Sequence, residues 1–259
     1  SSGTGSAGNG QFRTLDQIKS SGTVRIGVFS DKAPFGYIDA DGKPAGYDVV
    51  YAERIGKDLG AQVDYVPVEA ASRVEFLQTA KVDIILANFT VTPERGEKVD
   101  FANPYMKVSL GVVSPDSALI TEEPQLKDKK IIVVKGTTAE TWLAASHPEI
   151  EPDKYEQYND ATSALADGRG DAWVTDNTEA LAWAIASDGF TAGITALGDP
   201  DSIAGAVTKG NGTLLSWLNE HLVTLGKEQF FHADFEQTLR PVYGESTSAE
   251  ELVVEGGQL

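Results

Sequence analysis

The segment ANFTVTPERGEKVDFANPY, residues 87–105, decides how the rest of this chain is interpreted. Just before it, the apolar run VDIILA at residues 82–87 predicts a buried strand. Thr92 is a favourable N-cap residue, and Pro93 suits the first position of a helix because no N–H is needed there. The sequence therefore predicts a buried strand, a polar turn and the start of a short helix.

Arg95 is one turn into this short helix, and Asn88 and Thr90 precede it as neutral hydrogen-bonding residues. Backbone amides at a helix start attract anions, and a guanidinium can donate two parallel hydrogen bonds to a carboxylate. We interpret this turn as a site for the α-carboxylate of a small amino acid. The alternative is an arginine that is solvated on a surface helix.

Size and composition limit the classes of function. The chain has 259 residues, enough for one large domain or two small ones with a buried core. Its formal net charge of −18 argues against binding nucleic acid or an anionic membrane surface through bulk electrostatics. No apolar run approaches the ~20 residues of a membrane-spanning helix. The lack of cysteine excludes disulfides, thiol catalysis and zinc–thiolate sites, and is consistent with an extracytoplasmic protein.

Residues 1–22 are expected to form an N-terminal linker and a short helix. The opening stretch, SSGTGSAGNG, has the composition of a flexible linker and is interpreted as a tether or an expression remnant. It contains a GxGxxG spacing, but no strand precedes it and no helix follows directly. A dinucleotide site is therefore rejected.

Beyond this linker, strands alternate with helices in two successive groups, which predicts α/β lobes with largely parallel sheets. The first group has strands at 24–28, 61–67 and 82–87, and helices at 47–59 and 72–80. The second group has strands at 130–134, 155–158 and 172–176, and helices at 137–146, 160–167 and 178–187. The groups are connected by strands predicted at 107–114 and 203–209. Two helices follow at 212–225 and 228–239, and the tail is expected to add an edge strand at 252–254.

This order predicts one lobe with a second lobe inserted into it. The first lobe comprises residues 23–110 and 205–259, and the second comprises residues 111–204. Two connecting strands make a hinge, and the cleft between two lobes is a favoured place for a small ligand. A zwitterionic ligand in this cleft needs a cation or amide donors at one end and a carboxylate at the other.

Asp176 is the best candidate for the carboxylate that receives an ammonium group. It ends the apolar strand DAWVTD and precedes a helix, so it is predicted at the carboxyl edge of a sheet, where open α/β folds bind ligands. The alternative is an ordinary N-cap aspartate. A second candidate anion site is the strand-to-helix turn at Gly136, Thr137 and Thr138. Simple capping of the helix by threonine is the alternative there.

Aromatic residues of the first lobe are further candidates. Phe35, Tyr37 and Tyr47 can form an aromatic wall around the carbon atoms of a ligand. The alternative is that they fill the core or the surface, as such residues more often do.

Two basic residues of the first lobe are also candidates for ligand contacts. Arg73, near the start of its helix, is placed to read a ligand side chain or to brace the closed cleft; its alternative is a solvent-facing arginine. Lys32 is a similar candidate, and the adjacent Asp31 is the alternative partner that would neutralise it.

The sequence offers little support for catalysis. The three histidines, at positions 147, 221 and 232, are too dispersed to indicate a metal pair. There is no GxSxG, HExxH or P-loop motif. An enzyme would need a general acid in the cleft; no residue announces that role, although Glu179 lies too near the helix start at Asp176 to be excluded. We therefore expect no enzyme activity, no metal and no cofactor.

Four motifs, FTVTPERGEKVDFANPY, GKPAGYD, KGTT and GDAWVTDNTEAL, are together similar to the polar amino-acid solute-binding proteins of bacterial ABC importers. They occur in the order and at the separations typical of that family, and the resemblance extends from about residue 24 to the end of the chain. Within the family, VEAASRVEFLQTAKVDIILANF, GKEQFFHADFEQTL and VVEGGQL most resemble the cysteine-binding subgroup. The resemblance implies a type II periplasmic-binding-protein fold, in which two α/β lobes joined by two hinge strands close on one amino acid.

The resemblance also implies roles for individual residues. Arg95 and Thr90 would hold the α-carboxylate of the ligand, together with backbone groups near Asn88. Thr138 would join them from across the cleft, and Asp176 would take the α-ammonium group.

One wall of the implied site departs from the family pattern. The resemblance implies that Phe35 and Tyr47 flank the ligand. Many relatives have an aspartate and an aromatic residue where this chain has Phe29 and Lys32, so contacts on that wall differ. Related aspartate and glutamate binders use an arginine near Arg73 to read a side-chain acid.

The expected function is capture of a small polar L-amino acid, most of all cysteine, for an ABC permease. A cysteine carrier without a thiol of its own avoids mixed disulfides with its cargo. The alternatives are an aspartate- or glutamate-binding protein and, from a different class, a cyclohexadienyl-dehydratase-like enzyme on the same fold. The protein is expected to be a monomer that binds no nucleic acid. It is expected outside the cytoplasm, either periplasmic or lipid-anchored.

Overall fold

A computed structural model describes residues 11–259. The stretch 1–10, interpreted above as a tether, lies outside the described residues. Helix α1 (Leu15–Ser21) follows, with the side chain of Thr14 as its N-cap, so the predicted short helix is confirmed. No helix among residues 11–259 combines the length and apolar character that a membrane crossing requires.

One eight-stranded sheet runs through the whole molecule in the order β5-β1-β6-β11-β7-β10-β8-β9. Its two outer parts are parallel, since β1 pairs with β5 and β6, and β8 pairs with β9 and β10. The central pairs are antiparallel. The strands are β1 (Thr23–Val28), β5 (Gln62–Pro67), β6 (Ile84–Ile85), β7 (Val99–Pro115), β8 (Ile131–Val134), β9 (Asp153–Tyr155), β10 (Ala172–Asp176) and β11 (Phe190–Thr208).

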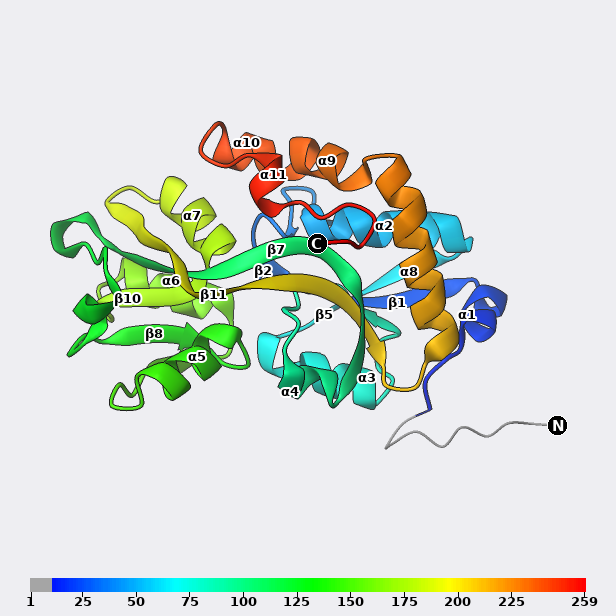
Figure 1. Ribbon diagram of the computed structural model, residues 1–259, viewed down its shortest axis with the longest axis horizontal. Helices are drawn as coiled ribbons and strands as arrows, with labels where there is room; N and C mark the ends of the chain where they lie inside the picture. Colours follow the sequence, from blue (N-terminus) through cyan, green and yellow to red (C-terminus); the bar gives the residue numbers. More distant parts are fainter. Residues whose placement is uncertain (1–10) are drawn as a thin grey trace.

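Two long strands in the middle of the sheet, β7 and β11, connect the two ends of the molecule. They pair antiparallel from Val99 and Thr208 at one end to Pro115 and Phe190 at the other, with several register shifts between. Figure 1 shows both strands crossing from the group of elements around β1 to the group around β10. The two predicted connecting strands are therefore confirmed, and the structure has the expected two-lobed α/β fold.

Helices cover the sheet in both lobes (Figure 1). Those of the second lobe are α5 (Thr138–Ser146), α6 (Tyr158–Ala166) and α7 (Asn177–Ile185). Those of the first lobe, besides α1, are α2 (Tyr47–Leu59), α3 (Arg73–Gln78), α4 (Pro93–Gly96), α8 (Gly212–Lys227), α9 (Phe230–Asp234), α10 (Arg240–Tyr243) and α11 (Ala249–Leu252). A small separate sheet is formed by β2 (Asp31–Lys32), β3 (Gly36–Ile38) and β4 (Pro44–Ala45).

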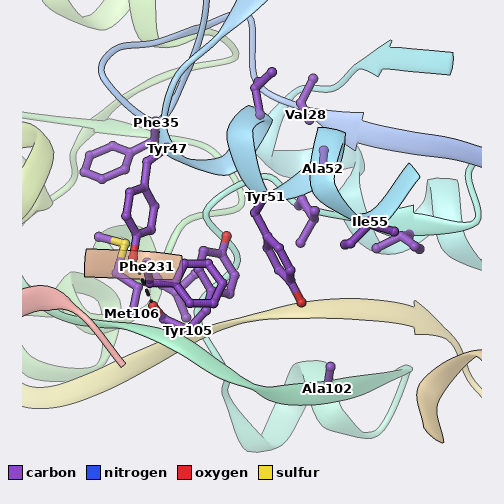
Figure 2. Close-up of a cluster of buried hydrophobic side chains, with 14 of the residues drawn as sticks. Val28, Phe35, Tyr47, Tyr51, Ala52, Ile55, Ala102, Tyr105, Met106 and Phe231 are labelled. Carbon is purple, nitrogen blue, oxygen red and sulfur yellow. Dashed lines mark hydrogen bonds between the residues drawn. The ribbon is translucent and has the colours of Figure 1, made fainter. Parts of the chain in front are cut away.

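An aromatic cluster forms the core of the first lobe and fixes the start of α2. Figure 2 shows Tyr47, Tyr105 and Phe231 packed together, with Phe35 beside them. The ring centroids of Tyr47 and Tyr105 are 6.0 Å apart, and those of Tyr105 and Phe231 are 5.5 Å apart. The Tyr105 hydroxyl donates to Oδ1 of Asp48, the second residue of α2, at 2.7 Å. The cluster therefore holds the helix that follows the small sheet against the central strand β7.

Several predicted boundaries are wrong. β7 begins at Val99 rather than 107, and β11 begins at Phe190 rather than 203. β6 is only two residues long, because the chain turns into the polar loop after Ile85. β9 ends at Tyr155, and Tyr158 begins helix α6 rather than ending a strand. The tail forms α11 and then a single bridge from Val253 to Met106, not an edge strand, because Leu252 is buried as the last residue of a helical turn.

Candidate functional site

Three basic side chains from the first lobe, those of Lys32, Arg73 and Arg95, lie along one line at the seam between the lobes. Aromatic rings separate these cations, in the order Tyr158, Lys32, Phe29, Arg73, Phe89 and Arg95, and we call this arrangement the charged row. Each cation lies 4.6 to 5.6 Å from the centroid of a neighbouring ring. Ring faces stabilise buried cations by cation–π attraction, which helps to hold three positive charges close together.

At one end of the charged row, Lys32 makes an ion pair across the seam. Its Nζ lies 2.6 Å from Oδ2 of Asp176 in the second lobe and 2.9 Å from Oδ1 of Asn88. Lys32 is only 1% exposed. Burial alone would lower the pKa of Lys32, but Asp176, together with Tyr158 and Glu179, outweighs burial and raises it. Lys32 is therefore charged, and its partner is Asp176 rather than the adjacent Asp31.

The carboxylate of Asp176 does not cap the helix that follows it. Asp176 stands at the N-cap position of α7, yet its side chain accepts no capping hydrogen bond. The alternative of an ordinary N-cap aspartate is therefore wrong. The strand β10 delivers this carboxylate to the seam, as expected for a residue at the carboxyl end of a strand.

Asn88 links the two ends of the charged row. Its backbone has a positive φ of 48°, and its N–H donates to Oδ2 of Asp48 at 2.9 Å. Its side-chain oxygen receives the Lys32 ammonium, and its carbonyl receives Nη1 of Arg73 at 3.4 Å. Burial raises the pKa of Asp48 to about 7, while Tyr105, Lys32 and Asn88 oppose that rise. The turn at Asn88, which the sequence predicted, therefore contacts both Lys32 and Arg73 and fixes their positions relative to one another.

At the other end, the hydrogen bonds that Arg73 and Arg95 donate all go to backbone carbonyls, as far as residues 11–259 show. Nη2 of Arg73 and Nη2 of Arg95 both donate to the carbonyl of Gly136 in the second lobe, at 3.0 and 2.8 Å. Arg95 also donates to the carbonyl of Thr90 at 2.7 Å. Among residues 11–259, no carboxylate lies within ion-pair distance of either guanidinium. Burial and then the neighbouring Arg73 lower the pKa of Arg95 to about 9.

Gly136 brings the second lobe against the arginines by its backbone. Its φ is +79°, and a Cβ built there would lie 2.5 Å from Cα of Ala71, so only glycine allows this approach. Its N–H donates to Oε1 of Glu140 at 2.9 Å. This hydrogen bond uses one of the backbone amides of the expected anion site. Thr137 caps α5, accepting from the Glu140 amide at 3.3 Å. The capping alternative is therefore confirmed for Thr137; anion binding by Thr137 and by the half-buried Thr138 stays a prediction.

Among residues 11–259, the rings of the three predicted wall residues do not adjoin the cations of the charged row, although the Phe35 N–H donates to the Lys32 carbonyl at 2.9 Å. Phe35 and Tyr47 are fully buried in the aromatic cluster of the first lobe (Figure 2), and Tyr37 is half-buried on β3. Their place beside a ligand stays a prediction. The rings that do adjoin the cations are those of Phe29, Phe89 and Tyr158. Two of these rings had a signal in the sequence: Phe89 lies between Asn88 and Thr90 in the deciding segment, and Phe29 stands where the chain departs from the family pattern.

Glu179 is a further buried acid near Asp176. The hydroxyl of Thr175 donates to its Oε1 at 2.9 Å, and the side chain is almost fully buried. Burial raises the pKa of Glu179 to about 8, which Lys32 partly opposes and Asp176 reinforces. Glu179 is therefore mostly protonated at neutral pH and adds little negative charge to the site.

The lobes also contact one another beside Phe29 and Tyr158. These two rings meet edge to face at 5.1 Å, and the backbone N–H of Asn159 donates to Oδ2 of Asp31 at 3.1 Å. A cavity of about 460 Å³ lies along this contact, lined by residues of both lobes. The lobes are thus held together on the Lys32 side as well as at Gly136.

The fold and the charged row are those of a two-lobed α/β protein that binds a small ligand at the seam between its lobes. The chain belongs to the bacterial extracellular solute-binding proteins, family 3, whose family model matches residues 24–235. The resemblance found in the sequence and the type II fold that it implied are both confirmed.

Two solved structures and one curated protein illustrate this relationship. The crystal structure of the solute receptors for L-cysteine of Neisseria gonorrhoeae has a TM-score of 0.92 at 50% identity, covering 94% of this chain and 100% of that chain. The cysteine-binding protein of Campylobacter jejuni has a TM-score of 0.91 at 48% identity, covering 93% and 98%. The ABC transporter glutamine-binding protein GlnH of Bacillus subtilis (strain 168) is 30% identical over 215 residues, which are 81% of this chain and 78% of that protein.

Proposed function

We propose that this protein captures L-cysteine between its two lobes and delivers it to an ABC permease. One observation carries the proposal: a guanidinium and a carboxylate from different lobes meet at the same seam, where Arg95 donates to the carbonyl of Gly136 at 2.8 Å and Asp176 lies 2.6 Å from Lys32. A zwitterion needs such opposite charges on two sides. The choice of cysteine is supported by the similarity of nearly the whole chain to the two cysteine-binding proteins named above.

In this proposal the ligand's α-carboxylate is held by Arg95, Thr90 and the backbone of Asn88. Thr138 adds a contact from the second lobe, at the N-terminal end of α5. Asp176 receives the α-ammonium group and shares its two oxygens between the ligand and Lys32. Charge-assisted hydrogen bonds at both ends fix the orientation of the ligand.

The remaining candidates have secondary roles. Arg73 and Lys32 face the side chain of the ligand, because they are the neighbouring cations on either side of Phe29 in the charged row. Gly136 and Thr137 shape the second-lobe side of the site. Phe35, Tyr37 and Tyr47 back the first-lobe side, where Phe35 and Tyr47 pack in the core.

The lobes in this proposal are residues 23–110 with 205–259, and residues 111–204, and they move about β7 and β11. The ligand favours the closed form because only that form brings Arg95 and Asp176 to it together. Micromolar affinity corresponds to about −8 kcal/mol, which two buried charged contacts can supply. The closed form is then what the permease recognises.

We further propose that the protein works as a monomer outside the cytoplasm, in the periplasm or on a lipid anchor, and binds no nucleic acid. Its family is one of bacterial extracellular proteins. The strongly negative net charge of −18 disfavours contact with nucleic acid.

Calorimetry with reduced L-cysteine tests the proposal, with L-glutamine, L-arginine, L-aspartate and L-glutamate as competitors. We expect cysteine to bind most tightly. Arg95→Gln should weaken cysteine binding about a hundredfold, because the α-carboxylate loses its charged donor. Arg169→Gln, on an exposed arginine of the second lobe, is the matched control and should bind as the unaltered protein does. Equal affinity of Arg95→Gln and the control would reject the carboxylate assignment, and tighter binding of aspartate or glutamate would reject cysteine.

A dehydratase-like enzyme is the second candidate, and one observation favours it. Burial raises the pKa of Glu179 to about 8, so a protonated carboxyl group suited to general acid catalysis lies near Asp176 at neutral pH. Turnover of a cyclic amino-acid precursor that disappears in Glu179→Gln would support the enzyme. Tight amino-acid binding without turnover supports the binding protein, which is our proposal.

A further inference from the structure

The charges at the seam do not balance. Lys32, Arg73 and Arg95 bring three positive charges, and within the described part of the chain Asp176 is the one carboxylate paired with any of them. Both guanidiniums are held by neutral carbonyl oxygens. Carbonyls solvate a buried cation but do not cancel its charge, and burying an uncompensated charge is costly.

The other ionisable groups around the row do not remove the surplus. Glu179 on α7 is mostly protonated at neutral pH, because burial raises its pKa to about 8. Asp48 on α2 has a pKa raised to about 7 by burial, so it is ionised in part. For Tyr158 on α6, burial raises the pKa to about 12, so it is neutral.

Two acids at the edges of the row complete this set. Asp31 on β2 accepts from the backbone of Asn159, and Asp201 on β11 is exposed, so water and salt screen its charge. Burial raises the pKa of both. Even with Asp48 fully ionised, the buried Lys32 and Arg73 and the half-buried Arg95 face only two buried carboxylates among residues 11–259.

A zwitterionic ligand leaves this surplus unchanged, because its own charges cancel. We propose that L-cysteine binds as its thiolate, with the sulfur facing Lys32 and Arg73, so that the ligand enters with a net negative charge. This inference rests on the proposed function and names the ionisation state of its ligand. The free thiol has a pKa of about 8.5, and neighbouring cations favour the thiolate.

The thiolate explains how the site tells cysteine from its nearest analogue. Serine has the same shape, but its hydroxyl does not ionise in this pH range, so it cannot neutralise the surplus. A cationic side chain would add to the surplus, which rejects arginine and lysine. Lys32 and Arg73 are therefore the residues that determine specificity.

Proton release measured by calorimetry is the first test. Cysteine and L-serine are titrated at pH 7 in two buffers of different ionisation enthalpy, with serine followed by displacement where its own heat is small. We expect cysteine to release about one proton more than serine, because protein groups contribute equally to both. Between pH 6 and 8, the affinity for cysteine relative to serine should rise about tenfold per pH unit.

Ultraviolet absorbance is the second test, and this chain suits it because it contains no cysteine. Any thiolate absorbance therefore belongs to the ligand. At pH 6.5 the difference spectrum of the saturated complex should show a thiolate band, which S-methyl-L-cysteine, having no ionisable sulfur, cannot give.

Lys32→Met removes one cation at nearly constant length, and Lys57→Met, on the exposed face of α2, is the matched control. We expect Lys32→Met to weaken cysteine at least tenfold and to reduce the extra proton release, while Lys57→Met changes neither. Lys32→Arg, which keeps the charge, should restore the proton release. Cysteine binding without extra proton release and without a thiolate band overturns the thiolate but leaves the proposed function standing. No binding of cysteine at all overturns the proposed function instead.

Discussion

The two ends of the charged row hold their cations in different ways. At one end Lys32 has a carboxylate partner, Asp176, at 2.6 Å. At the other end Arg73 and Arg95 share the carbonyl of Gly136. A buried ion pair is largely neutral as a unit, whereas a guanidinium among carbonyls keeps its charge. Both ends therefore hold the two lobes together, but only the arginine end keeps uncompensated positive charge that attracts an anion.

Removing the carboxylate of Asp176 should have the largest effect on stability and affinity, because it removes the counter-ion of Lys32 at the neutral end of the charged row. Asp176→Asn leaves the buried ammonium of Lys32 without a counter-ion, which costs about 3–5 kcal/mol of stability. Amino-acid binding should weaken by at least about a hundredfold, since the ligand's ammonium group also loses its partner. Chemical denaturation and calorimetry measure the two effects.

The matched control for this change is Asp188→Asn, on an exposed aspartate of the same lobe. It should leave stability and affinity unchanged. If Asp176→Asn is as stable as this control, the ion pair contributes nothing to stability. Lys32 then does not need Asp176 as its counter-ion.

A methyl group at position 136 tests the arginine end, with the next largest effect. Gly136→Ala places a Cβ 2.5 Å from Cα of Ala71, which keeps the lobes from closing on the arginines. We expect affinity to fall about a hundredfold, about 2.7 kcal/mol, by calorimetry.

Gly168→Ala separates this clash from backbone strain. Gly168 also has a positive φ, +74°, but a Cβ there meets nothing within 4 Å. Both variants therefore lose about 1 kcal/mol of stability through the left-handed backbone, and only Gly136→Ala should lose affinity. Equal affinities in the two variants would mean that the Gly136 contact does not govern closure.

Much of the fold was predictable because local patterns decided it. Helix α2 begins at Tyr47 and ends before Gly60, as its apolar period and glycine stop predicted. The last strand of the second lobe matches its predicted range of 172–176. The length of β11 was not predictable, because residues 190–202 are rich in glycine and polar residues and become a strand only by pairing with β7.

The candidate site was predictable in its residues but not in its pairings. Arg73, Arg95, Asn88 and Asp176 were all named from the sequence, since each lies near the end of a predicted strand or the start of a predicted helix. The sequence offered Asp31 as the partner of Lys32, yet neighbouring residues on a strand point to opposite sides, and Lys32 instead reaches Asp176, 144 positions away. Pairings of that separation depend on the fold, which local spacing does not encode.

The pH dependence of stability tests whether Glu179, which lies near the Lys32–Asp176 ion pair, is protonated in the native protein. The pKa of Glu179 is raised from 4.5 to about 8, so the native protein keeps this proton over a pH range in which the unfolded chain has released it. The unfolding free energy should therefore fall as pH rises from 4.5 to 8 and level off above.

Glu179→Gln should flatten this fall, by on the order of 2 kcal/mol between pH 5 and 8, because glutamine has no proton to lose. Denaturation curves at several pH values measure it. Glu75→Gln, on an exposed residue of α3, keeps the original slope if burial is the cause. An unaltered slope in Glu179→Gln would show that this carboxyl is ionised, and the surplus of positive charge would be smaller than inferred.

The smallest effect is expected where an ion pair has the same length as Lys32–Asp176 but lies in water. Lys135 and Glu156 are 2.7 Å apart within the second lobe, and each side chain is about half exposed, at 44% and 51%. Water and salt screen such a pair, so Glu156→Gln should leave the denaturation midpoint indistinguishable from that of the unaltered protein. Distance is thus held nearly constant while burial changes. A loss as large as that of Asp176→Asn would show that proximity, and not burial at the seam, sets the strength of these pairs.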